Sequence, residues 1–177
     1  MDINGLKHLS DYLDRADQMS LIEEWRDCVN KAPLYTPVMP RSGRPFSVRM
    51  TNLGALGWVS DRSGYRYQQR HPETGQPWPA MLDRILDIWR DVSGYEPLPE
   101  ACLVNWYTKG ARMGLHRDED EEDMSAPVVS VSLGDSAVFR IGGADRKDKT
   151  RSIKVHSGDV IVMGGDARMI YHGIDRT

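Results

Sequence analysis

Residues 128–133, Val128-Val129-Ser130-Val131-Ser132-Leu133, are one of seven short runs rich in Val, Ile and Tyr in the second half of the chain. The other runs are 102–107, 113–116, 137–141, 153–156, 160–163 and 169–172. Turn sequences such as Ser157-Gly158-Asp159 and Gly164-Gly165-Asp166 separate them. Short strands at near-even spacing are typical of a β-sandwich or jelly roll.

Two segments before these runs have helical periodicity. In the first, the apolar residues at helical spacing are Leu21, Ile22, Trp25, Cys28 and Val29. Asp17 or Ser20 is a candidate N-cap there, and Pro33 closes the segment. In the second, the apolar stripe is Leu82, Ile85, Leu86 and Trp89. Pro79 suits its first turn and Gly94 its end. We expect a mainly β fold with flanking helices (α+β).

Length and composition favour one enzyme-sized domain. A chain of 177 residues can bury roughly two thirds of its unfolded surface. Two cysteines cannot make a disulfide framework, which fits a reducing cytoplasm. The chain has no leading basic and apolar segment and no run of ~18 apolar residues, so we expect a soluble protein without membrane association. Nothing in the sequence demands a partner subunit, and we expect a monomer.

A net charge of -3 argues against a general polyanion binder, which would carry a broad excess of Lys and Arg. Any contact with nucleic acid is therefore expected from a local basic patch.

The triplet His116-Arg117-Asp118 places two ligand types at i and i+2. In an extended segment both side chains leave from the same face, so they can share one metal ion. A third ligand must come from elsewhere, and His172 lies at the end of the last predicted strand, just before Gly173. Two imidazoles and one carboxylate are the facial triad of non-heme Fe(II) oxygenases. An H-x-D triplet is common in polar loops, so its surroundings decide.

Six motifs occur in a fixed order along the chain. They are LGW at 56–58, QPWPAM at 76–81, NWY at 105–107, GLHRD at 114–118, APVVSVSLG at 126–134 and YHGI at 171–174. Together they closely resemble the AlkB family over residues 54–174. The resemblance implies a double-stranded β-helix core, which agrees with the jelly-roll pattern of the strands.

The resemblance also implies an activity. His116, Asp118 and His172 would bind Fe(II), with O2 and 2-oxoglutarate as cosubstrates. Residues implied to hold 2-oxoglutarate are Asn105, Tyr107 and Ser130. Decarboxylation of 2-oxoglutarate would drive hydroxylation of an N-alkyl carbon, and the alkyl group would then leave as an aldehyde. The implied substrate is alkylated DNA or RNA, presented as a flipped base or a single strand.

Bases methylated at adenine N1 or cytosine N3 are cations, which an aromatic face and a carboxylate hold well. By the resemblance, Trp58 and Tyr65 form a stacking lid, Asp120 accepts from the exocyclic amine and Arg146 contacts the substrate. Further candidates for phosphate contact are Lys147, Lys149, Arg151, Arg112 and Arg117. The alternatives are a core role for Trp58, an ordinary strand position for Tyr65, and a solvated acidic loop at 118–123.

We expect a single domain in which residues 1–100 form N-terminal helices and a substrate lid, and residues 101–177 form the jelly-roll core. The family carries an Arg-x-Asn-x-Thr-x-Arg strand after the distal histidine, whose first arginine pairs with 2-oxoglutarate. Arg176 is predicted to lie in a turn and is a poor substitute. A further C-terminal segment in the working protein is the favoured expectation; the alternative is a degenerate relative.

Two other functions stay open. The first keeps Fe(II) and 2-oxoglutarate but acts on tRNA, protein or lipid. A pocket for a cationic base needs both Trp58 and Asp120, whereas a pocket for a lysine side chain or a lipid needs neither. The second is a non-catalytic nucleic-acid-binding module with a structural metal. A structural zinc site usually has four ligands, often cysteines, and neither Cys28 nor Cys102 lies beside the triad in the sequence.

Overall fold

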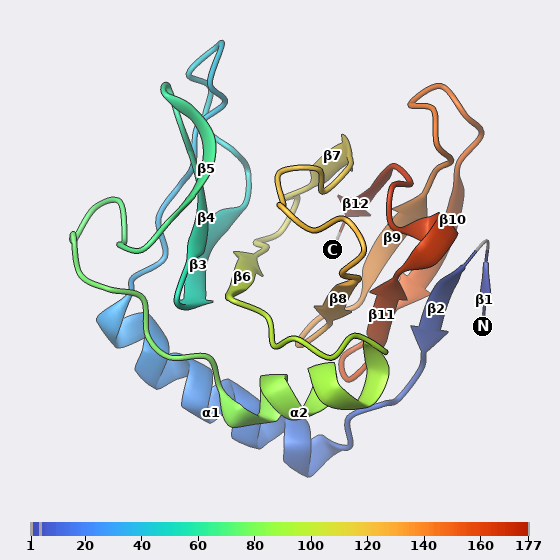
Figure 1. The fold of residues 1–177 in the computed structure, drawn as a ribbon, viewed down its shortest axis with the longest axis horizontal. Helices are drawn as coiled ribbons and strands as arrows, with labels where there is room; N and C mark the ends of the chain where they lie inside the picture. Colours follow the sequence, from blue (N-terminus) through green and yellow to red (C-terminus); the bar gives the residue numbers. More distant parts are fainter. Residues whose placement is uncertain (1, 4, 177) are drawn as a thin grey trace.

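The structure is a computed structural model that describes residues 2–3 and 5–176. Eight of its strands form two four-stranded antiparallel sheets (Figure 1). The first sheet has the order β1 (Asp2–Ile3), β2 (Leu6–Leu9), β11 (Val160–Met163) and β8 (Val128–Val131). The second has the order β10 (Arg151–Val155), β9 (Ala137–Ile141), β12 (His172–Arg176) and β7 (Met113–His116).

The two sheets share one hydrophobic core. Phe139 and Ile141, two apart on β9, point to the same side and pack with Ile161 and Met163 of β11. Leu6 of β2 is fully buried in the same cluster. The sheets therefore lie face to face as a jelly roll.

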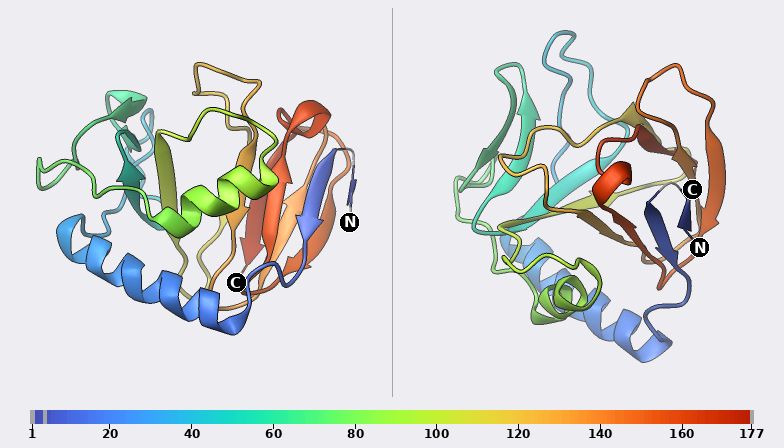
Figure 2. Two further views of the ribbon diagram at one scale, coloured as in Figure 1. Left: turned by 60° about the horizontal axis from the view of Figure 1, so that its bottom comes forward. Right: turned by 45° about the vertical axis from the view of Figure 1, so that its right-hand side comes forward.

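Two helices cover the outer face of the first sheet (Figure 2). They are α1 (Arg15–Lys31) and α2 (Asp83–Val92). Leu21 of α1 and Ile88 of α2 pack against Val160 and Val162, which face away from the jelly-roll core. Strand β11 is thus buried on both faces. None of the helices in the described ranges is long and apolar enough to cross a membrane.

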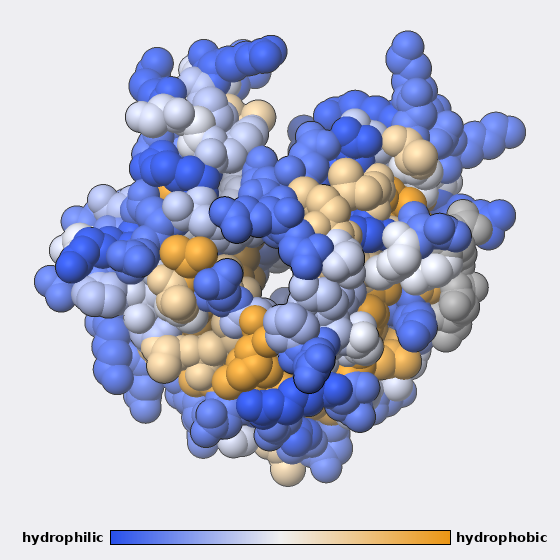
Figure 3. All heavy atoms as spheres, in the orientation of Figure 1, coloured by the Kyte–Doolittle hydropathy of each residue, from blue (hydrophilic) through white to orange (hydrophobic). Residues whose placement is uncertain are grey.

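A second unit lies opposite the jelly roll. Strand β3 (Arg49–Gly54) pairs with β6 (Ala101–Trp106), and β4 (Gly57–Asp61) pairs with β5 (Gly64–Gln68). We call the β4–β5 pair the lid hairpin. The space-filling view shows a hollow between this side of the molecule and the jelly-roll side (Figure 3).

Both helices exist, but their predicted starts are wrong. Asp14, and neither Asp17 nor Ser20, caps α1: its side chain accepts from the Asp17 backbone N–H at 2.8 Å. Helix α2 begins at Asp83, so Pro79 precedes it instead of forming its first turn. Its end agrees with the prediction, since Gly94 follows it with a φ of 65°.

The last strand is shifted along the chain. Residues 169–172 were predicted to form it, but β12 begins at His172, after the short 3-10 helix η1 (Gly165–Ala167). Ile170 is buried in the jelly-roll core although it lies in a turn. Its apolar side chain therefore made residues 169–172 look like a strand in the sequence. The backbone of Arg176 lies in β12 and not in a turn; its side chain lies outside the described residues.

The expected division at residue 100 does not follow the sheets. Strand β2 pairs with β11 inside the jelly roll, and β6 pairs with β3 outside it. The first hundred residues also contain strands that the sequence did not predict.

Candidate active site

Strand register brings the two candidate histidine ligands together. His116 ends β7, His172 begins β12, and the two are directly paired residues of the antiparallel ladder. Their ring centroids are 4.5 Å apart. Gly173 permits this approach, because a Cβ there would lie 2.6 Å from the Met113 carbonyl oxygen. The sequence predicted the pair of histidines, and the ladder explains how they meet.

Asp118 completes the cluster from the loop that follows β7. One of its carboxylate oxygens lies 3.6 Å from His116 Nε2 and the other 3.4 Å from His172 Nε2. One ligand atom from each of the three residues lies within 4.8 Å of the others. In the described part of the chain, no other group of three or more His, Cys, Asp or Glu residues could hold a metal ion in this way.

Backbone carbonyls orient both imidazoles. Nδ1 of His116 lies 2.8 Å from the Gly114 oxygen, and Nδ1 of His172 lies 3.3 Å from the Ile170 oxygen. With Nδ1 donating to a carbonyl, the lone pair of each ring is on Nε2, the atom that faces Asp118. These bonds prepare both Nε2 atoms for a metal ion.

The pKa shifts of His116 and Asp118 also suit a metal ion. Burial, followed by the neighbouring His172, lowers the pKa of His116. Burial alone would raise the pKa of Asp118, but His172, His116 and Arg168 outweigh it and lower that pKa. Neutral imidazoles and an ionised carboxylate are the forms that bind metal. Two nitrogen donors and one oxygen donor fit an octahedral Fe(II) ion with three positions left for cosubstrates.

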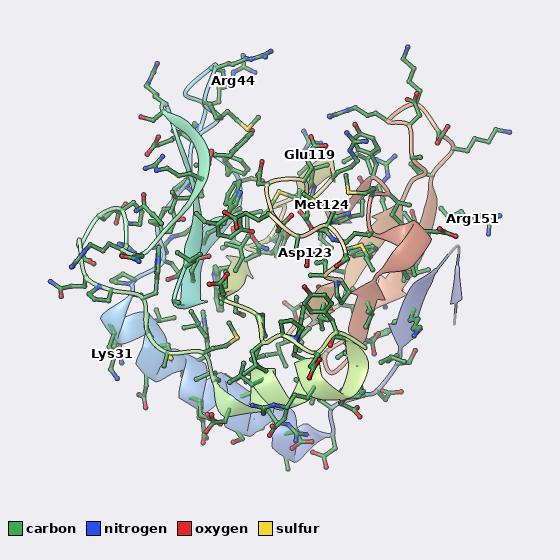
Figure 4. The ribbon with its side chains drawn as sticks, viewed as in Figure 1. Lys31, Arg44, Glu119, Asp123, Met124 and Arg151 are labelled. Atoms are coloured by element: carbon green, nitrogen blue, oxygen red, sulfur yellow. The ribbon has the colours of Figure 1, made fainter. Side chains whose placement is uncertain are left out.

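The predicted base-binding residues also lie together. The Trp58 indole donates from Nε1 to Asp120 at 3.0 Å, and its ring stacks on Tyr65 with centroids 5.5 Å apart and planes 21° apart. Trp58 and Tyr65 come from the lid hairpin, whereas Asp120 comes from residues 117–127, which we call the acidic loop. Figure 4 labels Glu119, Asp123 and Met124 of this loop between the lid and the jelly roll.

Arg146 lies on the jelly-roll side of the site. Its guanidinium is 5.9 Å from the ring centroid of Tyr171, and that of Arg117 is 5.0 Å from the same centroid. The positive charge of Arg146 also contributes to the lowered pKa of His116. The guanidinium groups of Arg117 and Arg146 therefore both lie near Tyr171, the residue before His172.

Comparison with known proteins identifies the family. The family model of the 2OG-Fe(II) oxygenase superfamily matches residues 5–177. An alpha-ketoglutarate-dependent dioxygenase AlkB homolog of Caulobacter vibrioides is 52% identical over 164 residues, 93% of this chain and 74% of that protein. The chain belongs to the AlkB family. It is therefore an Fe(II)- and 2-oxoglutarate-dependent dioxygenase that uses O2.

Two further similarities extend this result. The DNA N(6)-methyladenine demethylase ALKBH1C of Arabidopsis thaliana is 44% identical over 194 residues, covering 96% of this chain and 42% of that protein. The solved structure of OsALKBH1 superimposes with a TM-score of 0.82 at 30% identity, covering 99% of this chain and 86% of that one. The jelly-roll core expected from the sequence is confirmed.

The implied 2-oxoglutarate residues of this AlkB-family chain lie on two different sheets. Asn105 is exposed on β6, Tyr107 follows the end of that strand, and Ser130 is half-buried on β8 opposite Ile161. Strand β6 ends at Trp106, so only Asn105 of the predicted pair lies within it. Their role in holding 2-oxoglutarate stays a prediction.

Sequence reasoning missed Asn52, which fixes the position of Trp58. The Asn52 side chain is fully buried, accepts from the Trp58 backbone N–H at 3.0 Å and donates to the Trp58 carbonyl at 3.0 Å. This amide thereby replaces a pair of strand hydrogen bonds between β3 and β4. Strand β3 mixes polar and apolar residues, so its sequence carries no signal that singles out Asn52.

Proposed function

We propose that this AlkB-family dioxygenase removes alkyl groups from N-alkylated bases of DNA or RNA, such as 1-methyladenine and 3-methylcytosine. The observation that carries the proposal is the aromatic and acidic site beside the triad: Trp58 stacks on Tyr65 and donates to Asp120. Asp120 lies two residues after the candidate ligand Asp118. The similarity to a DNA N(6)-methyladenine demethylase supports a nucleic-acid substrate.

The chemistry of the site matches a cationic base. An aromatic face attracts a cation, and the Asp120 carboxylate lies at the same place. Its hydrogen bond from Trp58 uses one carboxylate oxygen. The other can accept from the exocyclic amine of adenine or cytosine. A neutral or bulky substrate would gain little from this pair.

Each group has a separate task in the proposed reaction. His116, Asp118 and His172 would hold Fe(II), which with 2-oxoglutarate and O2 supplies the oxidation of the alkyl carbon. Trp58, Tyr65 and Asp120 would hold the base so that its alkyl group faces the triad. Because a pairing-edge adduct is hidden inside a duplex, the base would enter flipped out or from a single strand.

Arginines on both sides of the hollow would contact the sugar-phosphate backbone. Arg44 lies at the top of the lid side and Arg151 on the outer strand β10 (Figure 4). Arg146 and Arg117 lie nearer the triad, around Tyr171. Phosphate contacts position the strand, whereas the pocket reads the base. A monomeric state and a cytoplasmic location belong to the same proposal.

The test is direct. The protein is incubated with Fe(II), ascorbate, 2-oxoglutarate and a short single-stranded oligonucleotide that carries one 3-methylcytosine, and the oligonucleotide is weighed by mass spectrometry. We expect the loss of one methylene mass, and no loss when 2-oxoglutarate is omitted. An unchanged mass with continued consumption of 2-oxoglutarate would reject this substrate in favour of tRNA, protein or lipid. No consumption of 2-oxoglutarate with any substrate would contradict the proposed reaction.

A further inference from the structure

Arg168 is the one buried arginine among the described residues. It lies between η1 and β12, four residues before His172, and its side chain is 4% exposed. A buried guanidinium is costly unless its N–H groups find acceptors. The acceptors of the Arg168 guanidinium therefore indicate which segment this side chain stabilises.

All three hydrogen bonds of its side chain go to the acidic loop. Nε donates to the Ala126 carbonyl at 2.7 Å, and one terminal nitrogen donates to the Asp118 carbonyl at 2.6 Å. The other terminal nitrogen donates to the Glu121 carboxylate at 2.9 Å. Residues 117–127 are all described, and none of them lies in a helix or strand. Arg168 thus joins both ends of a loop that has no backbone ladder of its own.

Glu121 extends these contacts to the lid. Its second carboxylate oxygen accepts from the Tyr67 hydroxyl at 2.9 Å. Burial and the Glu121 charge raise the pKa of Tyr67, so the phenol keeps the proton that it donates. Tyr67 lies on β5 directly opposite Trp58 of β4. The lid hairpin is therefore attached to the acidic loop twice, through Tyr67 and through Trp58.

We propose that Arg168 is a positioning residue that sets the metal ligand Asp118 and the base acceptor Asp120 through one loop. Through Glu121 and Tyr67 it also fixes the lid hairpin relative to the metal centre. The chain Arg168–Glu121–Tyr67 couples substrate binding to the metal site, although neither Arg168 nor Tyr67 belongs to the candidate ligands His116, Asp118 and His172. The link to substrate rests on the proposed function; the link to Asp118 does not.

Two substitutions separate the two links. Arg168→Lys keeps the charge but loses the planar fork that reaches three acceptors. Tyr67→Phe removes only the hydroxyl that joins the lid to Glu121. Matched controls are Arg90→Lys, an exposed arginine of α2, and Tyr12→Phe, which breaks a tyrosine–carboxylate hydrogen bond to Asp91 far along the chain from the lid.

Metal binding is measured by titration with Co(II) alone, whose absorption spectrum reports the geometry of its ligands. Arg168→Lys should weaken Co(II) binding by roughly tenfold and alter the spectrum, since partners outside the ligand shell are worth about 10–100-fold in affinity. Tyr67→Phe should leave both unchanged. Both substitutions should raise KM for the 3-methylcytosine oligonucleotide, by about tenfold for Tyr67→Phe with kcat unchanged, as expected for one hydrogen bond to a charged group.

Wild-type Co(II) affinity and spectrum in a folded Arg168→Lys variant would overturn the link to Asp118. A wild-type KM in Tyr67→Phe would overturn the link to the lid. If Arg168→Lys does not fold, Glu121→Gln replaces it in both assays, and wild-type values there would equally overturn the proposal. If the wild-type enzyme removes no methyl group while Arg168→Lys still weakens Co(II) binding, the base substrate is wrong and the positioning role stands.

Discussion

The candidate metal ligands and the candidate base-binding residues are held in place by different means. His116 and His172 are paired residues of an antiparallel ladder, so backbone hydrogen bonds of the second sheet fix them. Trp58 and Asp120 face each other across a hairpin and an irregular loop, and single side-chain hydrogen bonds connect them. We therefore expect the ladder to tolerate the loss of one side chain and the loop to depend on each contact. Changes at the triad should therefore remove all chemistry, and changes at the lid should alter substrate use alone.

His116→Ala should have the largest effect. It removes a metal ligand but no backbone bond of β7, so the fold should persist while Co(II) or Fe(II) affinity falls by more than about a hundredfold, beyond the range seen for partners outside the ligand shell. Methyl removal should stop. Metal titration, circular dichroism and the oligonucleotide assay measure the three quantities. His156→Ala, at an exposed histidine, is the matched control.

Unfolding of His116→Ala would contradict the view that the ladder holds its shape without this side chain. If His116→Ala still removed methyl groups at the wild-type rate, His116 would not be a metal ligand.

Asp120→Asn should have the next largest effect, confined to the substrate. The amide oxygen can still accept from Trp58, but the charge that attracts a methylated base is lost. We expect kcat/KM for 3-methylcytosine to fall about tenfold or more, since one base-reading contact is worth about 1–3 kcal/mol. Co(II) affinity should not change. Glu122→Gln removes the same charge from an exposed position of the same loop and should behave as wild type.

An equal fall in Glu122→Gln would show that the general charge of the loop matters, and would argue against a specific acceptor at Asp120. A loss of Co(II) affinity in Asp120→Asn would show that the metal and base sites are not separable.

The same contrast explains which parts of the molecule could be predicted from sequence. His116 and Asp118 were predicted together because they lie two residues apart and the motifs around them resemble a known family, although Asp118 lies in the loop after β7 and not in the strand. The pairing of His116 with His172 was not, because register between distant strands depends on the whole sheet. The last strand was predicted to start too early because Ile170 is apolar, like a strand residue, but packs into the core from a turn. Arg168 was missed because its partners lie 42 to 50 residues away in the sequence. Asn52 was missed because strand β3, which carries it, was not predicted.

Trp58→Phe should sharpen the comparison further. Phenylalanine keeps a ring to stack on Tyr65 but loses the N–H that donates to Asp120. A partly exposed hydrogen bond contributes about 0.5–1.5 kcal/mol, so KM should rise about threefold with kcat and Co(II) affinity unchanged. Steady-state kinetics on the 3-methylcytosine oligonucleotide measure this. If Trp58→Phe were worse than Asp120→Asn, stacking and not positioning of the carboxylate would dominate.

Asp61→Asn should have the smallest effect, on the turn of the lid hairpin. Arg66 donates to both oxygens of Asp61, at 3.0 and 2.8 Å, and together with the Ser63 backbone N–H lowers the pKa of Asp61 to about 2. Both side chains are about 40% exposed, so solvent screens the pair and the substitution should cost less than about 1 kcal/mol.

The sign of the pH dependence follows from the lowered pKa of Asp61. The unfolded chain binds this proton near pH 4 and the folded chain only near pH 2, so the contribution is complete above about pH 4 and is lost as pH falls toward 2. The difference in thermal unfolding between wild type and Asp61→Asn should therefore shrink below pH 4 and in high salt. A difference that stays constant across this range would mean that the pair acts through packing, and the lid would then be less dependent on single polar contacts than the comparison with the ladder implies.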